Sequence, residues 1–169
     1  MDNLLEFKNT ERALREYGER VAAAYREKMR GHGHFTMTPD TLIDHIDVDI
    51  IREGGGGISV ALDLNKYWKF VEWDTRPHFP PIDAIRAYVT AKPILPQPNE
   101  NGKIPTPEQV AWAIRGKIGK EGTKGTHDLA EAVDMINARY MRKIEEAVTM
   151  DIDEFTDGQI TLLFGKGSI

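Results

Sequence analysis

The chain has 169 residues, which suits a single domain spanning 1–169 whose core needs neither disulfides nor metals. It has no cysteine, and this excludes disulfide scaffolds, thiolate zinc sites and cysteine nucleophiles. The net charge is −5, from 27 acidic and 22 basic residues, which disfavours tight sequence-independent binding to phosphate backbones. The sequence shows no signal-peptide pattern and no apolar run of about 18 residues, so we expect a soluble protein made in a cytoplasm.

Residues 10–29 are predicted to form an amphipathic helix. Apolar side chains recur there at three- and four-residue spacing, with charged residues between them. Thr10 is suited to cap the start of this helix. Gly31 and Gly33 follow its last apolar residue, where glycine readily takes the left-handed conformation that ends a helix.

A β-hairpin is predicted next. Residues 46–50 and 58–64 alternate apolar with polar or small side chains, the period of a half-buried strand. The four glycines at 54–57 between them are typical of a hairpin loop.

The following segment, residues 67–73, is rich in aromatic side chains. In an extended chain, Trp68 and Phe70 would lie on one face, and Tyr67, Val71 and Trp73 on the other. We therefore expect a strand covered on both faces. Either it is fully internal, or it packs on its own core and on a neighbouring subunit.

Two shorter helices are predicted around a proline-rich loop. Prolines precede a helix at 82–91, and Pro93 ends it. Residues 93–107 contain five prolines and form the loop. Thr106, Pro107 and Gln109 then give a strong helix start, with a threonine cap, a first-turn proline and a glutamine that bonds back. This second helix is expected to reach about Gly119.

The C-terminal third is predicted to contain a long helix and a final strand. Residues 119–126 are rich in glycine, which favours a helix end followed by a turn. A phosphate-binding loop is disfavoured because Lys124 is followed by Gly125 rather than by Ser or Thr. Apolar spacing predicts a helix over 126–150, then a turn at 156–158 and a strand at 159–164. The fold class is thus α+β, with a small antiparallel sheet and helices at both ends.

The sharpest enzyme-like feature is the set His45, Asp47 and Asp49. These side chains share one face of the first predicted strand and could hold a hard metal ion or act as acid and base. Neighbouring side chains on that face lie about 6–7 Å apart. Two of them could therefore bind one metal ion only if other parts of the chain supplied further ligands. We therefore favour a solvated strand face and expect no metal and no cofactor.

Other candidate metal ligands have similar weaknesses. His32 and His34 lack a third ligand within sequence reach. The acids that begin at Asp151 fail the calcium-loop pattern, because its fifth and twelfth positions are Phe155 and Leu162. We predict no catalytic residue.

One segment resembles a known family. The run from Tyr67 to Pro77, YWKFVEWDTRP, resembles the aromatic segment of tail-component proteins of long-tailed double-stranded DNA bacteriophages, which reads roughly Tyr-x-x-Phe-Val-Glu-Tyr-Gly-Thr. The helix that follows Pro80 and Pro81 matches the order of elements in those proteins. Residues 104–125 look like a helix and loop that recur in some of them. Asp74 stands where the family tends to have glycine.

The resemblance implies a structural virion protein, not an enzyme. Such proteins form a closed ring, commonly with six-fold or twelve-fold subunit number, at the head-tail junction (neck) or tail terminus. The ring joins tail to head and lets DNA pass without specific binding. Its partners would be further copies of the chain and other connector or tail proteins, and its location the virion. Candidate subunit-interface residues are Tyr67, Trp68, Phe70, Trp73, Arg76 and Tyr140, since aromatic anchors dominate interface energetics.

Two other functions stay open from the sequence. One is a small metal-dependent hydrolase that uses His45, Asp47 and Asp49. The other is a monomeric binding module. The sequence also leaves open whether Trp73 lies in the core or at a subunit interface.

Overall fold

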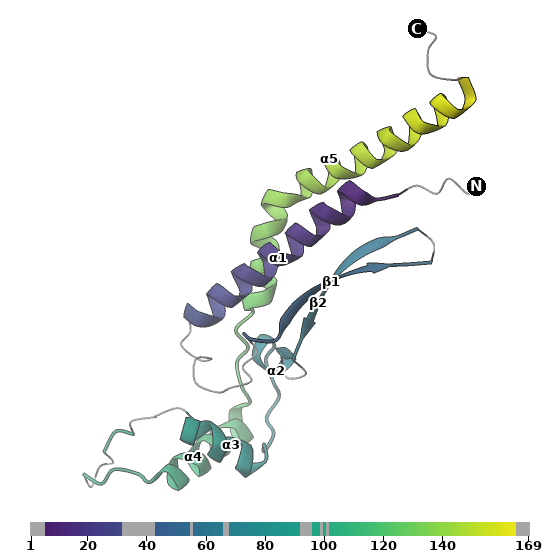
Figure 1. Ribbon diagram of the computed structural model, residues 1–169. Helices are drawn as coiled ribbons and strands as arrows, with labels where there is room; N and C mark the ends of the chain where they lie inside the picture. The colour runs from purple at the N-terminus through teal and green to yellow at the C-terminus, as the bar shows by residue number, and fades with distance from the viewer. Residues whose placement is uncertain are drawn as a thin grey trace.

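The computed structural model (Figure 1) describes residues 6–31, 43–54, 56–65, 68–91, 96–98, 100 and 102–164. His32, His34 and Tyr67 lie outside the described residues. Within them the fold is α+β, as predicted, with five helices and one two-stranded antiparallel sheet. None of the described helices is both long and apolar enough to cross a membrane.

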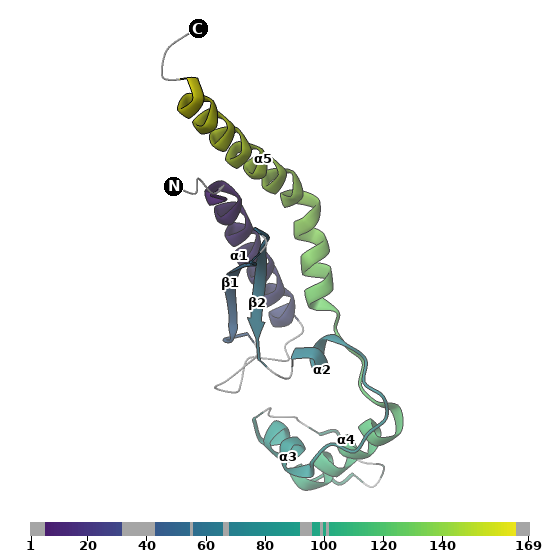
Figure 2. The same cartoon turned by 90° about the vertical axis from the view of Figure 1, so that its right-hand side faces the viewer.

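The body of the molecule is built on two helices that lie side by side (Figures 1 and 2), α1 (Lys8–Gly31) and α5 (Asp128–Phe164). Both helices were predicted, and they pack through their apolar stripes. The core between them and the sheet contains fully buried side chains from both helices, among them Tyr25, Met29 and Ala132.

The prediction of a turn and a last strand after α5 was wrong. Residues 156–164 continue the helix, which has 37 residues. Gly158 lies on an exposed side of α5, where it costs the helix about 1 kcal/mol relative to alanine but does not end it.

The predicted hairpin is confirmed as β1 (Ile46–Arg52) and β2 (Ile58–Leu64), paired from Ile46↔Leu64 to Arg52↔Ile58. The sheet packs against α1 at a glycine. A methyl group added to Gly18 would lie 2.5 Å from Cγ1 of Val48 and 2.7 Å from Cγ2 of Val60. Gly18 therefore lets the strands approach the helix backbone, which offsets its low helix propensity.

The aromatic segment is a short helix, α2 (Trp68–Glu72), so the prediction of a strand there was wrong. Trp68 and Val71 pack against the core, and Glu72 is buried. These three side chains are spaced i, i+3 and i+4, so a single helical turn brings them to the same face. Phe70 and Trp73 are 61% and 50% exposed, so this chain does not cover the segment on both sides.

The remaining two helices, α3 (Ile82–Ala91) and α4 (Pro107–Glu121), pack on each other and form a separate α3–α4 hairpin at one end of the molecule (Figure 2). Both were predicted. The Thr106 hydroxyl accepts from the Gln109 N–H at 3.3 Å, and the Gln109 side chain accepts from the Thr106 N–H at 2.9 Å. This is the capping box that the sequence indicated.

Candidate assembly surfaces

A joint connects the body to the α3–α4 hairpin, and the buried carboxylate of Glu72 lies at its centre. Its two oxygens accept from the backbone N–H groups of Leu129 at 3.0 Å and Ala130 at 2.9 Å. Those groups belong to the first turn of α5, where free donors and the helix dipole favour a negative charge. The backbone carbonyls of Val71 and Glu72 also accept from Thr126 (2.8 Å) and His127 (3.2 Å). Helix α2 thus fixes the start of α5.

The two segments that lead into the α3–α4 hairpin are joined further along. Thr75 and Thr123 form an isolated antiparallel bridge, with a 2.9 Å bond from the Thr75 N–H to the Thr123 carbonyl and their hydroxyls 2.7 Å apart. A methyl group on Gly122 (φ 75°) would lie 2.0 Å from the Thr75 carbonyl oxygen, and one on Gly125 2.3 Å from that of Glu72. These glycines therefore permit backbone-to-backbone contact. The glycine-rich loop ends α4, as predicted, and closes the joint.

The structure places the predicted interface residues in different surroundings. Phe70, Trp73 and Arg76 are exposed close to the joint, and the ring of Trp73 meets that of His127 edge-on at 5.8 Å. Trp68 is half-buried against the core. Tyr140 is half-buried on α5, where its hydroxyl lies 3.3 Å from a carboxylate oxygen of Glu16 on α1. Of the predicted interface residues that the structure describes, Phe70, Trp73 and Arg76 are thus the most open to a partner.

Exposed apolar side chains also gather on the α3–α4 hairpin, a surface that the sequence analysis did not single out. The Arg115 guanidinium lies over the rings of Phe79 (5.1 Å) and Trp112 (5.3 Å), and its Nε donates to the Pro80 carbonyl at 2.9 Å. Phe79 is 62% exposed and rests on Gly119, where a methyl group would lie 2.1 Å from its ring. The large apolar residues Tyr88, Ile104 and Trp112 are also exposed.

Ion pairs hold α3 against α4. The Arg86 guanidinium donates to both carboxylate oxygens of Glu108, at 2.8 and 2.6 Å, and to Asp83 at 2.8 Å. The indole of Trp112 donates to Glu108 at 2.8 Å. Hydrogen bonds from Arg86 and then Trp112 hold the pKa of Glu108 below its usual value. The bidentate geometry fixes the relative orientation of the two helices.

At the opposite end of the molecule, α5 continues past the start of α1 (Figures 1 and 2). The last contacts with α1 are polar and are made by Asp151 and by Glu154, whose carboxylate accepts from the Asn9 side chain at 3.3 Å. The buried Asp151 carboxylate accepts from the backbone N–H groups of Asn9 (2.9 Å) and Thr10 (2.8 Å) and from the Thr10 hydroxyl (2.6 Å). Burial acts to raise the pKa of Asp151, but these hydrogen bonds outweigh it and lower the pKa. Asp151 therefore caps the first turn of α1 from α5.

Residues 152–164 form a projecting segment, which we name the α5 arm. Its exposed large apolar side chains include Leu162 (71% exposed) and Leu163 (75% exposed), and also Ile152 and Ile160. Sequence analysis predicted a strand for its last six residues. The spacing of the apolar residues, which follows a helical period, was the signal that could have identified an exposed helix face.

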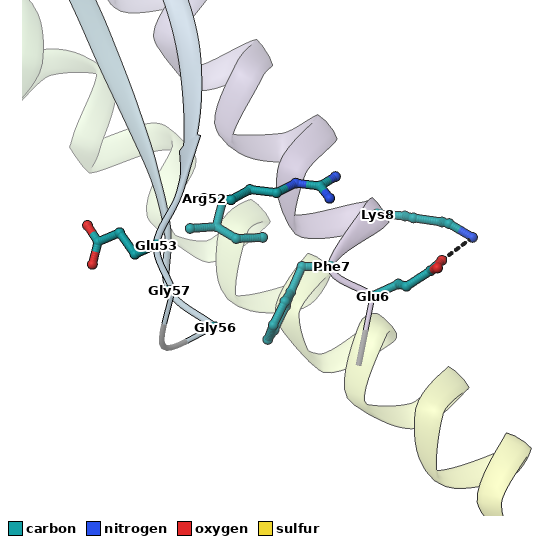
Figure 3. A pocket seen from close by; sticks show the side chains of 8 residues that line it. Glu6, Phe7, Lys8, Arg52, Glu53, Gly56 and Gly57 are labelled. Atoms are coloured by element: carbon teal, nitrogen blue, oxygen red, sulfur yellow. Dashed lines mark ion pairs between the residues drawn. The ribbon is translucent and has the colours of Figure 1, made fainter. Parts of the chain in front are cut away.

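A hollow of about 450 Å³ lies between the tip of the β-hairpin and the start of α1 (Figure 3). Phe7 and Ile58 supply its apolar lining. Both basic residues of its lining form ion pairs, Lys8 with Glu6 and Arg52 with Glu11. Its charged lining is balanced, with the acids Glu6 and Glu53 and the bases Lys8 and Arg52.

The structure leaves the candidate metal ligands at the first strand exposed. His45 directly precedes β1, and Asp47 and Asp49 lie in it. Across the described part of the chain, no three His, Cys, Asp or Glu side chains are placed to share a metal ion.

Neither the scan against protein-family models, nor the search of curated proteins, nor the search of solved structures found a match.

Proposed function

We propose that the chain is a structural virion protein of a tailed bacteriophage, forming a ring at the head-tail junction or tail terminus. The proposal begins with the resemblance of residues 67–77 and 104–125 to phage tail-component proteins. In that role the protein works as a structural part of the particle and catalyses no reaction. It joins tail to head and leaves a central passage for DNA.

The observation that carries the proposal is that both resembling segments meet in one joint. Residues 72–75 and 122–126 lie about 50 positions apart in sequence, yet the Thr75–Thr123 bridge and the close approach of Gly122 and Gly125 lock them together. The two stretches therefore serve one structural purpose. A joint of this kind sets the direction in which the α3–α4 hairpin leaves the body, which a ring subunit must hold constant.

The exposed apolar residues support assembly as well. They occur beside the joint, on the α3–α4 hairpin and on the α5 arm, and include the aromatic side chains Phe70, Trp73, Phe79 and Trp112. Large apolar surface on a folded chain commonly marks contacts with other proteins. Surfaces at both ends of one chain suit a head-to-tail contact, which closes into a ring when the rotation between subunits divides a full turn.

The direct test is electron microscopy of the purified protein, alone and mixed with tails that lack it. Closed rings, or rings at the end of the tail, are expected. A protein that stays monomeric in both samples and never attaches to tails would contradict the proposal.

A further inference from the structure

The α5 arm has an apolar side and an acidic side. Successive helix positions turn by about 100°, so Ile152, Ile160 and Leu163 lie within one sector, and Asp153 and Asp157 lie outside it. From residue 144 to 164 the sequence has six acidic residues and no Lys or Arg. The arm is thus an amphipathic helix with an excess of negative charge. It is about 20 Å long at 1.5 Å per residue.

The opposite end of the molecule has the opposite charge. Residues 74–127, which contain the α3–α4 hairpin and the two segments that lead into it, hold eight Lys and Arg and five Asp and Glu, whereas the rest of the chain holds fourteen Lys and Arg and twenty-two Asp and Glu. The hairpin end is therefore the basic part of an acidic chain. Figures 1 and 2 show that it lies far from the α5 arm.

A hollow on this basic end has the chemistry to receive the arm. It has a volume of about 420 Å³. Ile114 and Ile118 are its large apolar lining residues, and Lys117 and Lys124 line it with a single acid, Glu121. Neither lysine forms an ion pair with another described residue. The volume falls in the range of about 300–1,000 Å³ that ligand-binding pockets occupy.

We propose that the α5 arm of one copy docks in the Ile114–Ile118 hollow of the next copy, with Ile160 and Leu163 against these two isoleucines and Asp153 and Asp157 facing Lys117 and Lys124. This rests on the proposed function, because it names the subunit contact of the proposed ring. The two surfaces lie on different parts of one chain, so the contact is head-to-tail and can repeat from copy to copy. Complementary charge also fixes its register.

Two alternative docking sites for the α5 arm, a second α5 arm and the hollow beside Phe7, fit its charge less well. Two α5 arms side by side would bring like charges together, which is unfavourable. The hollow beside Phe7 has two acids and two bases, and Lys8 and Arg52 already have carboxylate partners. It therefore offers an acidic helix no excess of positive charge.

The test is photo-crosslinking of the full chain with the change Leu163→p-benzoylphenylalanine, using a mixture of ¹⁴N- and ¹⁵N-labelled protein at high concentration. Mass spectrometry is expected to find adducts that join Leu163 of one copy to residues 107–124 of another. Thr161→p-benzoylphenylalanine, on the opposite side of the arm, is the control and should give a lower yield. The proposal is overturned by adducts that lie mainly between two α5 arms, or by the absence of intermolecular adducts.

Charge exchange adds an independent test. Asp153→Lys with Asp157→Lys, and separately Lys117→Glu with Lys124→Glu, should each lower the crosslink yield about tenfold, since two attractions become repulsions. Mixing the two variants should restore the yield, because the reversed arm of one then meets the reversed hollow of the other. Failure of this rescue would contradict the contact.

The outcomes separate this contact from the proposed function. Rings seen by microscopy without the Leu163 adduct would reject the contact and leave the ring. Adducts in open chains that never close or join tails would reject the ring and leave the contact.

Discussion

The carboxylate of Glu72 accepts a hydrogen bond from the backbone N–H of Leu129, 57 residues further along the chain, and so caps the long helix α5 from the short helix α2. Glu72 is 1% exposed, so water cannot replace it as the acceptor. A charged residue is thus the structural centre of the joint.

Replacing this carboxylate should destabilise the protein. Glu72→Ala leaves the part-buried N–H groups of Leu129 and Ala130 without their carboxylate acceptor, and we expect a loss of about 1–3 kcal/mol in the free energy of unfolding. Glu72→Gln keeps one acceptor oxygen and should lose less. Urea denaturation followed by circular dichroism measures both. Equal stability of Glu72→Ala and wild type would show that the cap is not formed in solution.

Asp151 gives a prediction about pH. Its folded-state pKa is lowered, so its contribution is fully present above the unfolded value of about 3.9 and is lost as the pH falls through the folded value. Asp151→Ala should cost about 1.5–3 kcal/mol at pH 7, since hydrogen bonds to a charged group are lost. The difference from wild type should shrink below about pH 4. Urea midpoints at pH 7 and pH 3 test this, with exposed Asp153→Asn as the control. A difference that does not change with pH would refute it.

The glycines of the joint can be tested against a glycine outside it. Gly122→Ala places a methyl group 2.0 Å from the Thr75 carbonyl at a positive φ, and should destabilise the protein or open the joint. Gly116→Ala, in α4 with no atom near its added methyl, should instead stabilise by up to about 1 kcal/mol. Thermal unfolding gives the stabilities, and limited proteolysis at residues 122–127 reports opening of the joint. The same effect for both changes would contradict this account.

Replacing Trp73 and replacing Trp68 should have different effects, because Trp73 lies on the surface and Trp68 packs against the core. Trp73 is half-exposed, so Trp73→Ala should change the free energy of unfolding by less than about 1–2 kcal/mol while impairing assembly. Trp68 packs on the core, and Trp68→Ala should cost about 3 kcal/mol or more. Chemical denaturation and light scattering of both variants give the comparison. Loss of cooperative unfolding in Trp73→Ala would place that ring in the core instead.

Much of the fold could be predicted because its signals are local. The capping box at Thr106 and Gln109 is encoded within four consecutive residues. The alternation of apolar residues in β1 and β2, and their three- and four-residue spacing in α1 and α5, recur several times along each element. These elements were located to within a few residues, apart from the C-terminal end of α5.

The errors occurred where distant contacts decide the structure. Residues 68–72 have the aromatic and branched composition of a strand, but one turn of helix lets Glu72 reach α5. The sequence near Glu72 has no sign of a partner 57 residues away. At the C-terminus, the turn chemistry at Gly158 did not overcome a helix already established over many turns.

The candidate surfaces were predictable only in part. Phe70, Trp73 and Arg76 are accessible, as an interface requires, whereas the stack of Phe79, Arg115 and Trp112 combines residues up to 36 positions apart. Exposure depends on what the rest of the chain leaves uncovered. A list of aromatic residues therefore cannot show by itself which of them reach solvent.

Cryo-electron microscopy of the tailed phage particles assembled in cells that produce this protein tests the central claim most directly. The account predicts a closed ring of six or twelve copies around the DNA channel, at the neck or the tail terminus. Absence of the chain from the particle, or its presence there as isolated copies away from the channel, would contradict the account.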